Sequence, residues 1–79
     1  MKKEQTFISI VYVNGAFNDF ERWNYKRLST VVRDLKALYK NYPTLYDYPE
    51  DSVVKIYETA DKTTPENLRA TIPMKELRA

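Results

Sequence analysis

One helical pattern constrains the fold of this chain more than any other feature of its sequence. Apolar residues recur at steps of three and four positions along a single segment: Leu28, Val31, Val32, Leu35, Leu38, Tyr39 and Tyr42. At about 100° per residue they cover about a third of the helix circumference. Asn24 or Ser29 is suited to cap the start, and Pro43 ends the helix because the residue before a proline avoids the α region. The sequence therefore predicts one long amphipathic helix.

Two segments on either side of this helix have the composition of β-strands. Thr6–Val13 is dense in β-branched and aromatic residues and is apolar on both of its faces. A strand of this kind lies at the centre of a sheet, or a partner covers its second face. Ser52–Thr59 alternates, with Val54 on one face and Lys55 on the other. If the two strands are neighbours, we expect the crossover through the helix to make them parallel.

The segment after the first strand is open to two interpretations. Asn14 and Gly15 are the pair favoured in two-residue hairpin turns, because both positions accept positive φ. Residues 16–23 then either return as a strand or form a loop that leads into the helix. Three large aromatic residues of this region are expected in the core: Phe17, Phe20 and Trp23.

The C-terminal region also leaves two alternatives. Thr64 followed by Pro65 is typical of a helix start, and Pro73 would limit that helix to about two turns. Ala70–Ile72 is alternatively a short edge strand, since a proline directly after a strand suits an edge position.

These elements together predict a single small α+β domain over residues 1–79. One long amphipathic helix packs on a sheet of two to four strands, with a short C-terminal element, in two layers. We expect any flexible ends to be confined to residues 1–5 and 74–79. A chain of 79 residues buries only about 60% of the surface that it exposes when unfolded. This small core gives modest support to a homo-oligomer.

The residue inventory excludes most enzyme mechanisms. The chain has no cysteine and no histidine, which removes disulfides, thiol nucleophiles, imidazole bases and ordinary zinc sites. Its single glycine, Gly15, excludes a Walker loop and a dinucleotide fingerprint. The acidic residues Asp47, Glu50 and Asp51 match no EF-hand spacing. We therefore expect a protein that is not an enzyme and that needs neither a cofactor nor a metal ion.

The sequence has no feature of a membrane protein. No stretch approaches the about 18–20 apolar residues of a membrane span, and Glu4 and Gln5 interrupt the basic start that a signal peptide would have. We expect a cytoplasmic protein without a membrane partner. The frequent Lys, Asn, Tyr and Ile residues suit an AT-rich bacterial or phage genome.

Tyrosines are concentrated in the connector after the helix. Tyr42, Tyr46 and Tyr48 lie in this connector, Asn41–Ser52, which also contains Pro43 and Pro49. Tyrosine offers a large contact area and a polar tip, so it is enriched in protein interfaces, and the prolines would reduce the entropy lost on binding. The alternative is that these rings complete the core or cover the sheet edge. The leading hypothesis is a non-catalytic protein-interaction module, such as a small accessory or inhibitor protein, that binds a protein partner through this connector and a sheet edge.

Nucleic-acid binding is the alternative hypothesis. Lys26, Arg33, Lys36 and Lys40 fall within a helix sector about 80° wide that contains no carboxylate. Such a face contacts phosphates, or it is a solvated surface that keeps the protein soluble. The net charge of +2 is too small to decide between the two.

The sheet offers a second route to nucleic acid. Single strands stack on exposed aromatic rings that lie beside cations. Tyr12 on one strand, and Tyr57 with Lys55 on the other, would supply such a platform if exposed. Tyrosines on a small sheet are more often half-buried with a hydrated hydroxyl.

Overall fold

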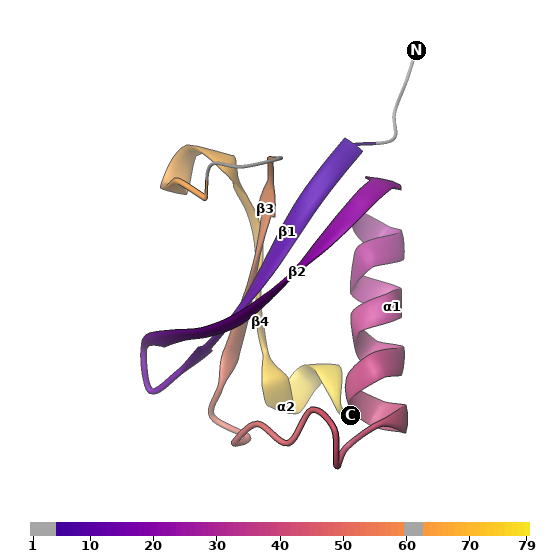
Figure 1. Ribbon diagram of the computed structural model, residues 1–79, viewed down its shortest axis with the longest axis vertical. Coiled ribbons are helices and arrows are strands. Elements are labelled where there is room, and N and C mark those ends of the chain that lie inside the picture. The colour runs from indigo at the N-terminus through magenta and orange to yellow at the C-terminus, as the bar shows by residue number, and fades with distance from the viewer. Residues whose placement is uncertain (1–4, 60–62) are drawn as a thin grey trace.

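The computed structural model describes residues 5–59 and 63–79. Its elements follow one another as β1 (Gln5–Val13), β2 (Ala16–Lys26), α1 (Leu28–Asn41), β3 (Val53–Glu58), the 3-10 helix η1 (Pro65–Asn67), β4 (Leu68–Pro73) and α2 (Met74–Leu77). The strands form one four-stranded antiparallel sheet in the order β2-β1-β3-β4, and both α-helices lie on the same side of it (Figure 1). The predicted two-layer α+β class is confirmed, with β1 at the centre of the sheet.

β1 and β2 form a hairpin with the predicted turn. Asn14 and Gly15 have φ values of 55° and 79°, and Val13 pairs with Ala16 across them. Positive φ at both turn positions matches the twist of the flanking strands. Residues 16–23 are therefore a strand rather than a loop.

The hairpin corrects the expected direction of β3. β3 pairs with β1 in antiparallel fashion, so the expectation that these two strands would be parallel was wrong. The crossover through α1 starts from β2, which is also antiparallel to β1 and therefore runs parallel to β3. The crossover through a helix thus joins two parallel strands, as expected, but these are β2 and β3. β1 lies between them in the sheet.

One extra residue in β2 sets which side chains face the helices. Phe17 pairs with Tyr12 and Asp19 pairs with Val11, so Asn18 between them has no partner in β1. Such a bulge reverses the alternation of the strand beyond it. As a result Phe20, and not Asp19, points to the side of the sheet away from α1.

The ends of α1 follow the sequence in part. The helix ends at Asn41, before Pro43, as predicted. Its N-cap is Arg27, whose side chain makes no capping hydrogen bond, so neither Asn24 nor Ser29 caps the helix. Asn24 belongs instead to β2, which is longer than the sequence pattern indicated.

The main core lies between the sheet and the two α-helices. Its buried residues are Phe7, Val11, Val31, Leu35, Tyr39, Val54, Ile56, Met74 and Leu77. Ser9 is a polar residue of β1 that is buried at 1% exposure, and Trp23 Nε1 donates a hydrogen bond to its Oγ at 2.9 Å. A buried hydroxyl without a partner costs about 1–3 kcal/mol, so the indole of β2 supplies both apolar contact and a needed donor.

The C-terminal region packs into this core. η1 is a single 3-10 turn rather than a helix of two turns, and Ala70–Ile72 lies in the edge strand β4. Residues 74–79 are one of the two segments to which flexible ends were expected to be confined; the structure begins α2 there at Met74, and Met74 and Leu77 are both fully buried. Residues 1–4 and 60–62 lie outside the described residues, so the expectation for residues 1–5 meets the structure only at Gln5 in β1.

The described residues contain no helix that is long and apolar enough to span a bilayer.

The burial of α2 predicts a large stability loss when its anchor is truncated. Leu77→Ala should lower the free energy of unfolding by about 2–5 kcal/mol, because it leaves a cavity in the core. Leu45→Ala is the matched control, since Leu45 is 73% exposed and surface substitutions usually change stability by less than about 0.5 kcal/mol. Urea unfolding followed by circular dichroism measures both. Equal midpoints for the two variants would contradict the docking of α2.

Candidate functional site

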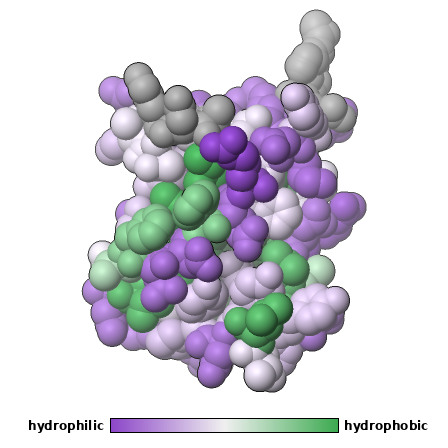
Figure 2. All heavy atoms as spheres, viewed as in Figure 1, coloured by the Kyte–Doolittle hydropathy of each residue, from purple (hydrophilic) through white to green (hydrophobic). Residues whose placement is uncertain are grey.

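The side of the sheet away from α1 carries a second apolar cluster. Ile8, Ile10 and Tyr57 are buried there, and Tyr12 and Leu68 pack against them. The two α-helices lie on the other side (Figure 1), and Figure 2 shows apolar atoms at the left of the molecule, over the strands opposite α1. We name this side of the sheet the open face.

β2 adds two exposed phenylalanines to the open face. Phe20 pairs with Ile10 and Phe17 pairs with Tyr12, and side chains of directly paired residues lie on the same side of a sheet. Phe17 is 59% exposed and Phe20 is 52% exposed, with their ring centroids 6.3 Å apart. The expectation that both would be core residues was wrong, whereas Trp23 does pack against the core. Exposed rings that continue a buried cluster are typical of an interaction site.

Two cations accompany these rings. Arg22 pairs with Ile8, and Lys55 pairs with Ile10 from β3, so both point to the open face. The Lys55 Nζ atom lies 5.1 Å from the centre of the Tyr12 ring, within the range of a cation–π interaction. Among the described residues, no carboxylate forms an ion pair with Lys55.

The carboxylates of the strands point the other way. Asp19, Glu21 and Glu58 each pair with a β1 residue that faces the helices. The Asp19 carboxylate accepts the backbone N–H of Phe20 at 2.8 Å, and Glu58 forms an ion pair with Arg69. Within the described strands, the open face therefore carries two cations and no carboxylate.

Two tyrosines of the open face are joined by a side-chain hydrogen bond, Tyr12 and Tyr57. Burial raises the pKa of Tyr12, and this hydrogen bond raises it further. The sequence correctly grouped Tyr12, Tyr57 and Lys55, and the structure brings all three to one face. Tyr57 is only 6% exposed, however, so most of the accessible ring surface comes from Phe17 and Phe20.

The predicted partner-binding tyrosines of the connector divide into two groups. Tyr46 and Tyr48 pack edge-on against Tyr39 of α1, with centroid distances of 5.5 and 6.1 Å. The Arg78 guanidinium donates hydrogen bonds to the carbonyl oxygens of Tyr46 at 2.7 Å and Tyr48 at 2.8 Å. Both tyrosines thus stabilise the domain itself. Tyr42 remains 55% exposed.

The buried tyrosines carry raised pKa values. Burial raises the pKa of Tyr39 far above 10, and the neighbouring Tyr48 and the Glu21 carboxylate raise it further. Burial also raises the pKa of Tyr48, whose hydroxyl is hydrogen-bonded to Asp19. Both hydroxyls therefore keep their protons under ordinary conditions.

The predicted cationic face of the helix is interrupted by an acid. Lys26 belongs to β2 rather than to α1, and its Nζ lies 3.8 Å from Asp34 Oδ2. Arg33 Nε lies 3.4 Å from Asp34 Oδ1, and Lys40 donates to a carbonyl oxygen beyond α2. Lys36 is exposed. The four cations therefore do not form the acid-free surface that the helix geometry suggested.

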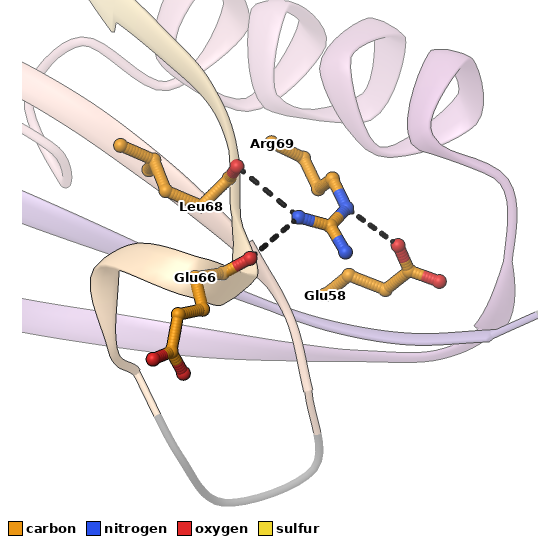
Figure 3. Close-up of polar contacts among 4 residues, drawn as sticks. All are labelled: Glu58, Glu66, Leu68 and Arg69. Carbon is orange, nitrogen blue, oxygen red and sulfur yellow. Dashed lines mark hydrogen bonds and ion pairs between the residues drawn. The ribbon is translucent and has the colours of Figure 1, made fainter.

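Contacts at both sheet edges oppose the addition of another strand. At β4, Arg69 Nε bonds Glu58 at 2.7 Å, and its Nη1 donates to the carbonyl oxygens of Glu66 and Leu68 (Figure 3). A register shift and the terminal Pro73 also interrupt this edge. The β2 edge has two register shifts and the Asp19 contact described above.

The described residues form neither a pocket nor a group of carboxylates suited to hold a metal ion. Asp47, Glu50 and Asp51 are exposed.

No protein-family model matches the chain, and neither a curated protein nor a solved structure matches it. The function is therefore inferred from the surfaces of the domain.

The raised pKa of Tyr39 predicts a loss of stability at high pH. Tyrosines of the unfolded chain ionise near pH 10, whereas native Tyr39 retains its proton to higher pH. The free energy of unfolding should be unaffected by this group below about pH 9, and should fall as the pH rises from about 10 toward the native pKa. Urea unfolding over this range measures the slope. Tyr39→Phe should reduce it and Tyr42→Phe should not; equal slopes in the wild type and Tyr39→Phe would contradict the assignment.

Proposed function

We propose that this protein is a non-catalytic protein-interaction module that binds its partner on the open face of the sheet. One observation carries the proposal: Phe17 and Phe20 are exposed beside a buried apolar cluster on the side of the sheet away from both described α-helices. The connector is a weaker candidate, because Tyr46 and Tyr48 are bound to Tyr39 and Arg78.

The composition of the open face suits a protein interface. Binding energy concentrates in a few central aromatic residues with a polar margin around them. Phe17 and Phe20 each have about half of their surface left to bury, which corresponds to about 1–1.5 kcal/mol per ring. Because the rings sit on a sheet instead of a loop, little conformational entropy is lost when a partner binds.

A second copy of the chain suits this face less well. Two open faces packed together would enclose the Lys55 ammonium groups of both copies in one interface, with no strand carboxylate of the described residues between them. Juxtaposed like charges oppose such an association. The favoured partner is therefore a different protein.

Single-stranded nucleic acid is the competing occupant of the face. Rings beside cations form a stacking platform, but the strands place only Arg22 and Lys55 on this side. Phosphate binding gains affinity with each cation engaged, so two cations give little electrostatic affinity.

Selection from a library of displayed random peptides tests the proposal. Peptides selected on the wild-type protein should lose about tenfold or more in affinity for the double variant Phe17→Ser/Phe20→Ser, which corresponds to about 1.4 kcal/mol. The matched control is Tyr42→Ser/Leu45→Ser. It alters two exposed apolar residues of the connector after α1, at 55% and 73% exposure, and should retain the affinity. Circular dichroism checks that both variants fold. Peptides that bind the phenylalanine variant as tightly as the wild type would refute the open face as the binding site.

A further inference from the structure

We propose that the partner of the open face is an amphipathic protein segment whose apolar side chains are flanked by carboxylates. This inference rests on the proposed function and adds the chemistry of the partner. It is carried by the distribution of charge across the sheet: the strand carboxylates Asp19, Glu21 and Glu58 point toward the helices, whereas two of the strand cations, Arg22 and Lys55, point to the open face.

This distribution follows from the pairing register. Beyond the bulge at Asn18, β2 alternates so that Phe20 and Arg22 point to the open face while Asp19 and Glu21 point toward the helices. If β2 paired regularly through Asn18, the two carboxylates would lie on the open face and the ring and the guanidinium would not. The bulge therefore places both Phe20 and Arg22 on the open face.

The position of Lys55 indicates where a negative charge of the partner would lie. Its ammonium group lies over the Tyr12 ring, beside the Ile10 position that pairs with it and with Phe20. A wholly apolar partner that covered this face would remove water from Lys55 and leave the charge unpaired, which is unfavourable. A partner carboxylate at this margin would replace the lost water with a charge-assisted hydrogen bond, so complementary charge selects the partner.

The apolar half of the partner is set by Phe17 and Phe20. Ile8 and Ile10 of β1 are already buried at 6% and 4% exposure, whereas Phe17 and Phe20 remain 59% and 52% exposed. α1 and α2 cover the opposite face of the sheet. A partner segment with an apolar stripe would cover the two rings and add a third layer.

A charge cycle on peptides from the displayed random library tests this inference. For the tightest peptide that depends on Phe17 and Phe20, all Asp and Glu residues are replaced by Asn and Gln. Affinity for the wild type should fall about fivefold or more, whereas the same replacement should have no effect on binding to Lys55→Gln. Lys36→Gln is the control, since Lys36 is an exposed lysine of α1, and it should retain the wild-type response. The affinity that the acidic residues of the peptide contribute should also decrease at high salt.

The outcomes separate this inference from the proposed function. Peptides that need Phe17 and Phe20 but tolerate neutralisation would overturn the acidic partner and leave the protein-binding role intact. Peptides that ignore the phenylalanines would overturn both. Tight, ring-dependent binding of oligo(dT) would identify single-stranded nucleic acid as the occupant instead. A dimer on light scattering that Phe17→Ser/Phe20→Ser dissociates would identify a second copy.

Discussion

The pairing of β2 with β1 determines most of what this domain presents to its surroundings. The Asn14-Gly15 turn fixes the register at the hairpin end, and the unpaired Asn18 shifts it by one residue. Since side chains alternate along a strand, a shift of one residue exchanges the two faces of everything beyond it. The shift turns Phe20 to the open face and Glu21 toward the helices.

The helix side of the sheet makes direct use of this arrangement. Trp23 donates to the buried Ser9 hydroxyl, and Asp19 is hydrogen-bonded to the Tyr48 hydroxyl and accepts the Phe20 N–H. The Trp23 contact satisfies a buried hydroxyl that would otherwise destabilise a small core. The other two contacts hold one strand carboxylate, that of Asp19, on the helix side of the sheet.

The sequence predicted the parts of the fold that depend on local pattern. The periodicity before Pro43 predicted α1, the two-sided β1 predicted its central position, and Asn14-Gly15 predicted the turn. Each of these signals lies within one element, where spacing alone specifies which side chains face inward.

The candidate site was less predictable because it depends on longer-range features. To predict the exposure of Phe20 one must know of the bulge, and to predict the exposure of both rings one must know that the two α-helices lie on the other side of the sheet. The pattern of residues 16–23 fits either a strand or a loop, so it does not locate the bulge. The engagement of Tyr46 and Tyr48 depends on Arg78, about 30 residues further along the chain, and no spacing within the connector indicates such a contact.

The small size of the domain is one reason to interpret the two exposed rings as a binding surface. A domain of 79 residues has little apolar surface available for its core, and this one buries even its terminal α2 side chains at Met74 and Leu77. Phe17 and Phe20 of β2, in contrast, stay outside that core. The exposed half of each ring contributes little to the stability of the free domain, whereas its burial by a partner would gain the apolar contribution of that half. This balance supports our proposal that another molecule covers the two rings.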